Sequence, residues 1–320
     1  MPRFTVLICT HDRAELLGRT LASLNAARRP QDWVVDILVV ANACSDTTHA
    51  FLENYQHQAV ALDWLPLAWF AEPTPGKSHA LNAALPRLGA DWVAFVDDDH
   101  RIDSGWLTAL TDAIAAHDDA DLFCGRILPD WDGREPDWVH DEGPWRIYPL
   151  PIPRQDFGAE ARLLTADGPL PGGGNLVASR ACLIRTGPFS TALGPTGHDL
   201  GGAEDMDWLR RALGSGARLR YVPEAVQYHY VDLARLTTPY LLRKAFERSA
   251  SVVVIEDDGQ TRGVPLYLWR KLAGYAWRAA ISLDASRRRF YLVRSAAAVG
   301  EIAGHLRRRR ARRAMATASL

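Results

Sequence analysis

The first 126 residues alternate between two hydrophobic patterns. Short continuous apolar runs have the length of buried strands, while the stretches between them repeat apolar residues at helical spacing, as Leu17, Leu21 and Leu24 do. The strand-like runs lie at 4–9, 36–40, 62–70, 92–96 and 121–126, the helix-like stretches lie at 13–27, 77–88 and 106–117, and residues 45–48 are typical of a further helix start. Because strands and helices alternate, we predict parallel βαβ units, and hence an α/β fold with a mostly parallel central sheet flanked by helices.

The periodic pattern stops between residues 128 and 171, a segment rich in proline that carries Trp131, Trp138 and Trp145. A loop region of this length inside a compact domain is usually a lid or a binding wall, so we expect it to face a substrate; a domain boundary is the alternative. The sequence after it predicts a strand at 175–179, a helix that starts at Glu204, two short strands at 219–222 and 225–228 separated by a Pro-Glu turn, and helices at 238–251, 265–283 and 286–313.

Three consecutive carboxylates, Asp97, Asp98 and Asp99, follow the apolar run that ends at Val96. Adjacent carboxylates repel one another, so their place at the end of a buried strand favours a bound cation. Hard oxygen ligands suit Mg2+ or Mn2+, and ligands of open α/β sheets bind outside the carboxyl ends of the strands. The alternative is a solvated acidic turn that caps the helix expected to begin near Ser104.

Composition excludes several classes of protein. Hydrophobic residues make up 48% of the 320 residues and charged residues 23%, which is ordinary for a globular protein and excludes disorder and fibrous designs. The four cysteines form no CxxC pair, which argues against a zinc knuckle or a disulfide framework and fits a reducing cytoplasm. We find neither a leader segment nor an apolar stretch of the roughly 18 residues that a membrane span needs.

The net charge of −1 hides a basic C-terminal region. Between Arg262 and Arg313, fourteen arginine and lysine residues stand against two acidic ones, a local charge of +12. Such a region attracts polyanions, and Trp269, Tyr275 and Trp277 are spaced to share an apolar helix face. We therefore expect either an interfacial helix on an anionic membrane surface or a helical hairpin with a solvated basic face, and no nucleic-acid partner.

Four motifs, in order, resemble those of the inverting family 2 glycosyltransferases: VLICTHDR, VVANACSDTT, VAFVDDDH and AEDMDWLRRALGSGARLRYVPEAVQYHY. GKSHALNAAL and GGGNLVASRACLIRTGPF are similar to the connecting segments, so that the resemblance covers residues 4–230. It implies a metal-dependent GT-A fold for a catalytic domain at 1–235, with a nucleotide-sugar-binding half at 1–126 and an acceptor-binding half at 127–235. Residues 236–320 form a basic, helical extension in this division.

The resemblance also implies residue roles. Asp97 and Asp99 would hold Mn2+ or Mg2+ and the sugar diphosphate, and His229 would be the third protein ligand. The donor would also contact Asp98 and Lys77, and Gly173 and Gly174 let the backbone pass close to a ligand. The residues of the nucleotide-contacting loop would be Thr10, Asp12 and Arg13.

The resemblance also implies which residues contact the nucleotide base and which residues act on the acceptor. Ala41 stands where the family commonly has an Asp that binds uracil, so Asn42 or Asp46 would take over that contact, with a UDP-sugar as the expected donor. Asp205 would be the general base that takes the proton of the acceptor hydroxyl, and Glu204 would orient the acceptor.

Two other functions stay open from the residues themselves. A nucleotidyltransferase would need a glycine-rich basic loop after the first strand, and residues 10–13 contain no glycine. A non-catalytic nucleotide-sugar-binding protein would be expected to lack Glu204, Asp205 or His229, and all three are present. We expect a cytoplasmic enzyme, peripheral on the inner face of the membrane, that uses a glycan, glycolipid or other hydroxyl acceptor.

Overall fold

The computed structural model describes residues 1–193, 204–255 and 263–318. The chain divides into two compact units, the first made of Met1–Asp130 and Pro153–Tyr230, the second of Trp131–Ile152 and Val231–Leu320. This division differs from the expected boundary at residue 235, because the proline-rich segment is shared between the units. Val139 and Ile152 bury their side chains with Val231 and Leu236, and this small apolar cluster holds 131–152 in the second unit.

The first unit is built on one mixed sheet. Among the described residues it has nine strands, in the order β3-β2-β1-β4-β8-β6-β9-β5, with β7 paired to β9. Pairs β1 with β2, β1 with β4, β2 with β3 and β6 with β9 are parallel, while β8, β5 and β7 run antiparallel to their partners. The strands are β1 (Arg3–Thr10), β2 (Val34–Asn42), β3 (Leu67–Glu72), β4 (Trp92–Asp97), β5 (His100–Ile102), β6 (Leu122–Asp130), β7 (Arg162–Leu164), β8 (Asn175–Ser179) and β9 (Leu219–Tyr230).

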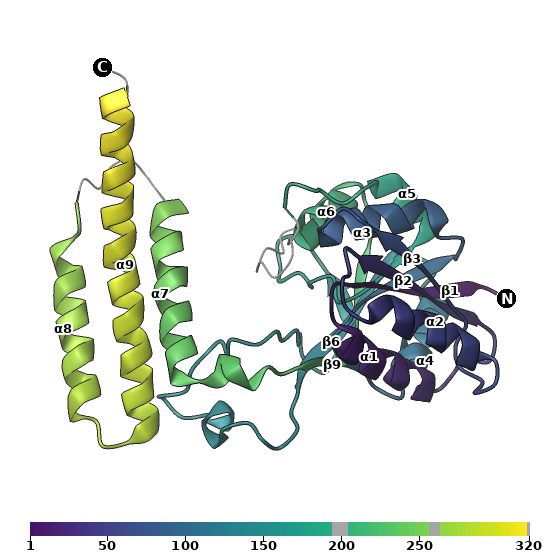
Figure 1. The fold of residues 1–320 in the computed structure, drawn as a ribbon, viewed down its shortest axis with the longest axis horizontal. Helices are drawn as coiled ribbons and strands as arrows, with labels where there is room; N and C mark the ends of the chain where they lie inside the picture. Colours follow the sequence, from purple (N-terminus) through teal and green to yellow (C-terminus); the bar gives the residue numbers. More distant parts are fainter. Residues whose placement is uncertain (194–203, 256–262, 319–320) are drawn as a thin grey trace. The chain divides into compact units, whose positions relative to one another are not determined.

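Helices cover both faces of this sheet (Figure 1). On one face, α1 (Ala14–Ala26), α2 (Thr48–Ala59) and α4 (Trp106–Ala116) bury Leu17, Leu52 and Trp106 against alternate residues of the strands. On the other face, α3 (Lys77–Ala84), α5 (Arg180–Thr186) and α6 (Glu204–Gly214) bury Leu81 and Trp208. The short 3-10 helices are η1 (Leu85–Arg87), η2 (Asp137–His140) and η3 (Leu233–Leu236). The expected α/β fold, a mostly parallel central sheet flanked by helices, is confirmed.

Strand β9 corrects one expectation. Residues 219–230 form one continuous strand instead of two short ones, and the irregularity lies in its pairing with β6, where the register shifts between Cys124 and Arg126. At this shift a Cβ on Gly125 would overlap the carbonyl oxygen of Ala225, so the two backbones approach closely. The bulge absorbs the Pro223-Glu224 pair, because proline is tolerated where the ladder is interrupted.

The second unit contains the three helices that the sequence predicts, α7 (Thr238–Ile255), α8 (Leu266–Ile281) and α9 (Ala285–Ala318) (Figure 1). Helix α9 packs against α7 through Gly300 and Gly304, where a Cβ would overlap the backbone of Phe246 and approach that of Ala250. An ion pair of 2.8 Å from Lys271 to Glu301 joins α8 to α9. No described helix is long and apolar enough to cross a membrane.

Candidate active site

Sheet topology brings the sequence-predicted residues to one edge of the first unit. Strands β1 and β4 end together, since Cys9 pairs in parallel with Asp97. The antiparallel strand β8 begins at this same edge, because Asn175 pairs with Val96, and so the Gly173-Gly174 turn lies beside Asp97. The end of β9 joins them through β5, with His229 opposite His100. The chain therefore gathers its carboxylates, glycines and histidines where open α/β sheets bind ligands.

A cluster of side chains with the types and spacing of metal ligands lies at this edge. Ligand atoms of Asp99, His100 and His229 fall within 4.8 Å of one another. Nε2 of His229 lies 3.7 Å from Oδ1 of Asp99, and Nε2 of His100 lies 3.9 Å from both Oδ1 of Asp99 and Oδ2 of Asp97. No role was predicted for His100, although it directly follows the three aspartates.

His100 has the environment of a metal ligand. Its side chain is 1% exposed, its Nδ1 lies 2.5 Å from the side-chain amide of Gln227, and its Nε2 has no hydrogen-bond partner among the described residues. A buried imidazole nitrogen without a partner is costly unless a ligand satisfies it. The set of two carboxylates and two imidazoles therefore fits a divalent cation such as Mn2+, with Gln227 orienting one ring from behind.

Asp98 is engaged within the protein instead. Its Oδ2 accepts a hydrogen bond of 2.7 Å from the Thr10 hydroxyl, and its Oδ1 accepts one of 3.1 Å from Arg13. The same guanidinium group reaches Oδ2 of Asp99 at 3.1 Å. Burial and the neighbouring Asp99 carboxylate raise the pKa of Asp98 to about 6. In the structure Thr10 and Arg13, which are expected to contact the nucleotide, hold the aspartate turn in place.

Lys77 links the predicted metal ligand to the predicted general base. Lys77 is the first residue of α3, and its Nζ lies 2.8 Å from Oδ1 of Asp97 and 3.7 Å from Oδ2 of Asp205. Burial opposes the charge of Lys77, but Asp205 and Asp97 raise its pKa well above the ordinary value. Burial likewise acts to raise the pKa of Asp97, whereas Lys77 and His100 hold it below its usual range. The lysine therefore favours the ionised form of Asp97.

Gly173 and Gly174 leave room for the carboxylates of Asp205 and Asp97. The backbone N–H of Gly173 donates a hydrogen bond of 3.0 Å to Oδ2 of Asp205, and a Cβ at position 173 would overlap that carboxylate. A Cβ at position 174 would overlap Oδ2 of Asp97 and press on the ring of His100. The backbone of the glycine turn was expected to pass close to a ligand. In the structure it passes close to the side chains of Asp205, Asp97 and His100.

Glu204 precedes Asp205 at the start of α6 and is 1% exposed. Its Oε2 has no hydrogen-bond partner among the described residues. Burial, with repulsion from Asp205, raises the pKa of Glu204 above its ordinary value. The start of α6 therefore carries two carboxylates in different environments, a half-buried Asp205 and a buried Glu204.

The residues expected near the nucleotide base mainly organise loops. The side-chain amide of Asn42 donates to the carbonyl of Thr74 at 2.7 Å and accepts from the N–H of Gly76 at 2.8 Å, which ties β2 to the loop before α3. Asp12, whose φ is 52°, accepts from the N–H groups of Ser45 at 2.6 Å and Asp46 at 3.1 Å. These bonds also explain why the Asp12, Cys44 and Asp46 side chains gather, a second group with metal-ligand spacing.

Comparison with known proteins agrees with this architecture. Residues 5–177 match the model of the family described as Glycosyl transferase family 2. Over 304 residues, 93% of this chain and 91% of the relative, the chain is 22% identical to the succinoglycan biosynthesis protein ExoM of Rhizobium meliloti.

Among solved structures, residues 1–349 of S. aureus TarS in complex with UDP superpose with a TM-score of 0.56 at 18% identity, covering 97% of this chain and 92% of that one. The mannosyltransferase PcManGT of Pyrobaculum calidifontis, in complex with GDP-Man and Mn2+, gives 0.54 at 17% identity, covering 96% and 87%. At such identities the likeness establishes the fold, which is the GT-A arrangement. Because the family match extends over more than half of the chain, the protein belongs to glycosyl transferase family 2 and is a glycosyltransferase.

Proposed function

We propose that this enzyme transfers a sugar from a nucleotide-diphosphate sugar to an acceptor hydroxyl, in a metal-dependent reaction that inverts the anomeric centre. The observation that carries the proposal is the gathering of Asp97, Asp99, His100 and His229 beside Lys77 and Asp205 at one edge of the sheet. Such a transfer needs a bound cation to stabilise the leaving diphosphate and a separate carboxylate to take the proton of the acceptor.

Asp99, His100 and His229, with Asp97, would hold Mn2+ or Mg2+. When bound, the divalent ion neutralises the negative charge that develops on the leaving diphosphate. Arg13 keeps the Asp99 carboxylate in place with a bond of 3.1 Å, and its side chain, 38% exposed, is still available to a phosphate oxygen. Lys77 adds a second fixed positive charge next to Asp97.

Asp205 would act as the general base. The Gly173 N–H and the Lys77 ammonium group both lie at Oδ2, which leaves Oδ1 to accept the proton of the acceptor hydroxyl. A single carboxylate suffices, because the hydroxyl oxygen attacks the anomeric carbon directly and the nucleoside diphosphate leaves from the opposite side. Glu204 would act through Asp205, as a positioning residue for the acceptor side.

UDP-sugar is the proposed donor. TarS structures contain UDP or UDP-GlcNAc, which supports uracil, whereas PcManGT contains GDP-Man. Of the two residues that could take over the contact with uracil, Asn42 is engaged in the loop before α3, so Asp46 is the remaining candidate. We assign the donor to the part of the first unit before residue 127 and the acceptor to the rest of that unit.

The proposed acceptor is a growing glycan or glycolipid at the cytoplasmic face of a membrane. ExoM is named for succinoglycan biosynthesis, which supports a polysaccharide product. In the second unit, α8 exposes Leu266 by 78%, Trp269 by 51% and Trp277 by 67%, and the bundle carries many arginines. This combination favours binding at an anionic lipid surface. Tyr275 belongs to the opposite side of α8, since its ring lies 6.2 Å from that of Tyr291 on α9.

The test is a panel of nucleotide sugars assayed for turnover with the wild-type enzyme and with Asp205→Asn. We expect at least a ~100-fold lower kcat with donor binding nearly intact, because only proton transfer is lost. Asp207→Asn is the matched control, since Asp207 lies on the same helix and pairs only with Arg211 among the described residues. Release of diphosphate from nucleoside triphosphates would indicate a nucleotidyltransferase, and donor binding without turnover a non-catalytic binder.

A further inference from the structure

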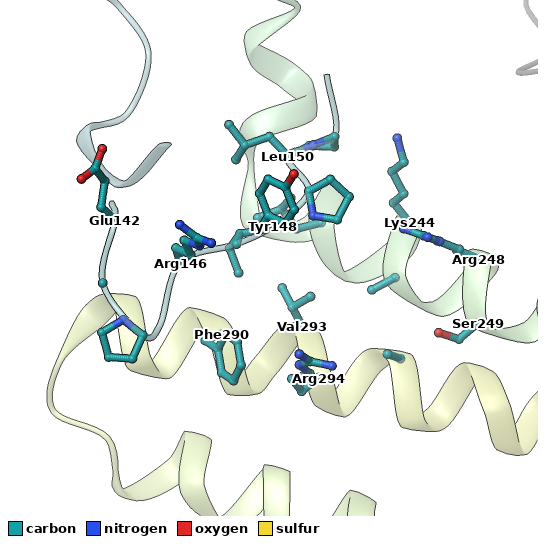
Figure 2. A pocket seen from close by; sticks show the side chains of 18 residues that line it. Glu142, Arg146, Tyr148, Leu150, Lys244, Arg248, Ser249, Phe290, Val293 and Arg294 are labelled. Carbon is teal, nitrogen blue, oxygen red and sulfur yellow. The ribbon is translucent and has the colours of Figure 1, made fainter. Parts of the chain in front are cut away.

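The second unit contains a cavity of about 770 Å³ that the proposed transfer reaction does not use (Figure 2). Its walls are the proline-rich loop 142–151, helix α7 and helix α9, all within that unit. A volume of this size is typical of sites for small organic ligands and exceeds what a single inorganic phosphate fills.

Positive charge dominates the lining. Arg146 comes from the loop, Lys244 and Arg248 from α7, and Arg294 from α9, while Glu142 is the one carboxylate among the lining residues. Among the described residues none of these four cations has an ion pair with a carboxylate at 4.0 Å or less. Lys244 and Arg248 are four positions apart on one helix, an arrangement that destabilises a helix when both are charged.

The local electrostatics reflect this imbalance. Burial, with repulsion from Arg235 and Arg248, lowers the pKa of Lys244 below its ordinary value. Two of the arginines are held over aromatic rings instead of carboxylates: Arg146 lies 5.3 Å from the Tyr148 ring centre and Arg294 5.1 Å from that of Phe290. Their donor groups are therefore positioned by stacking and left available for a ligand.

Part of the cavity wall is apolar. Ile147 and Leu150 on the loop, Leu241 on α7 and Val293 on α9 line it together with the two rings. A ligand that combines a highly charged group with an apolar or ring-bearing portion would contact both kinds of surface. Four cations against one carboxylate favour an anion with more than one negative charge, which distinguishes phosphate esters from simple carboxylates.

We propose that this cavity binds a phosphate- or diphosphate-bearing compound, whose oxygens accept hydrogen bonds from Arg248 and Arg294. Arginine suits this role because its planar fork matches two phosphate oxygens at once. The site is separate from the proposed donor site in residues and in charge carriers, and the inference does not depend on the proposed transfer reaction.

The test uses the full chain and inorganic diphosphate as the probe, in titration calorimetry at low salt with EDTA present. We expect saturable binding that the double variant Arg248→Gln/Arg294→Gln weakens at least ~10-fold, since charge-assisted hydrogen bonds are among the strong ones. Arg243→Gln is the matched control: it removes the same charge from α7, but Arg243 is 69% exposed and does not line the cavity. Lys77→Gln, which changes the donor side, should bind the probe like the wild type. Circular dichroism and Tm establish that each variant is folded.

A second arm identifies the source of the phosphate. Vesicles of phosphatidylcholine with and without phosphatidic acid are compared for the wild type and the double variant. A loss of phosphatidic-acid-dependent binding in the double variant assigns the cavity to a lipid head group, and unchanged vesicle binding beside lost diphosphate binding assigns it to a soluble phosphate ester. The proposal is overturned if the wild type does not bind diphosphate, if the double variant binds it equally well, or if Lys77→Gln alone abolishes binding.

Discussion

The N–H of Gly173 holds Oδ2 of Asp205 at 3.0 Å, and only a residue without a Cβ leaves room for that carboxylate. A turn before β8 thus positions the first turn of α6, although the two residues are far apart in the sequence. The geometry of the proposed base consequently depends on a glycine from a different part of the chain.

Gly173→Ala should lower kcat/KM for sugar transfer about 10- to 100-fold, because displacement of a catalytic group by even ~1 Å has effects of this size. Gly172→Ala is the control, since a Cβ at position 172 meets nothing within 4 Å and the N–H bond to Gln155 is kept. Both variants should have wild-type circular dichroism. Equal activity of the two variants would mean that the Asp205 carboxylate tolerates displacement or is not the base.

Much of the fold could be predicted from hydrophobic spacing. Strands such as 92–96 and helices such as 106–117 are local patterns, and the sheet follows from their alternation. The place of 131–152 in the second unit could not be predicted, because it results from contacts between Val139 or Ile152 and residues beyond 230. Such long-range contacts leave no periodic signal.

The residues of the site could also be predicted only in part, because some of them depend on long-range contacts. Asp97, Asp99, Asp205 and His229 stand in recognisable motifs, and the structure brings them to one edge of the sheet. His100 was missed because a histidine after three aspartates resembles a turn residue until β5 is seen to pair with β9. The engagement of Asp98 by Thr10 likewise depends on where the neighbouring strand ends.

Glu204→Gln should stabilise the first unit at neutral pH. Because burial raises the pKa of Glu204 above its ordinary value, the folded protein binds the extra proton, and the contribution of this group to stability falls as pH rises through the interval above that value. Removing a buried carboxylate whose Oε2 has no hydrogen-bond partner among the described residues should raise Tm by roughly 2–4 °C near pH 7.5, on the basis of ~1 kcal/mol for such a group.

The Tm difference between Glu204→Gln and wild type should shrink as pH falls toward 4.5, since a raised pKa means that Glu204 in the folded protein becomes increasingly protonated and, like glutamine, uncharged. Calorimetry across this pH range is the measurement. Glu15→Gln, at a position 82% exposed on α1, should change Tm by less than about 1 °C at every pH. A difference that does not vary with pH would contradict the assignment of an ionisation cost to Glu204.

Mn2+ binding in the absence of donor should depend on the histidines as well as on the aspartates. Asp99→Ala should abolish binding measured by electron paramagnetic resonance, and His100→Ala or His229→Ala should weaken it at least ~10-fold through loss of a ligand. Asp46→Asn, in the second group of metal-ligand spacing, should leave the affinity within about 2-fold, because Asp12 there is satisfied by backbone N–H groups.

The same site predicts the metal dependence of activity. Turnover should stop in excess EDTA and return with added Mn2+ or Mg2+. Full turnover in EDTA would show that the reaction does not need a metal. Loss of Mn2+ binding in Asp46→Asn would place the metal site at Asp12, Cys44 and Asp46 instead.

Helix α8 should mediate binding of the enzyme to anionic vesicles. Leu266 and Trp277 are exposed by 78% and 67%, and each basic residue close to an anionic surface contributes about 1 kcal/mol, so a few engaged arginines suffice for measurable attachment. The double variant Leu266→Ser/Trp277→Ser should therefore pellet with phosphatidylserine vesicles several-fold less than wild type. Ile184→Ser is the matched control, because Ile184 is 73% exposed but lies on α5 of the first unit.

Co-sedimentation at low and high salt separates the two contributions to this attachment. The electrostatic part acts over a Debye length, about 10 Å at 0.1 M salt and about 3 Å at 1 M, so recovery in the pellet should fall steeply between these conditions. The apolar part, carried by Trp277 and its neighbours on α8, should persist at high salt and be absent from the double variant. Equal recovery with neutral and anionic vesicles, or equal recovery of the double variant and Ile184→Ser, would mean that α8 packs against another protein surface and that the acceptor is a soluble glycan.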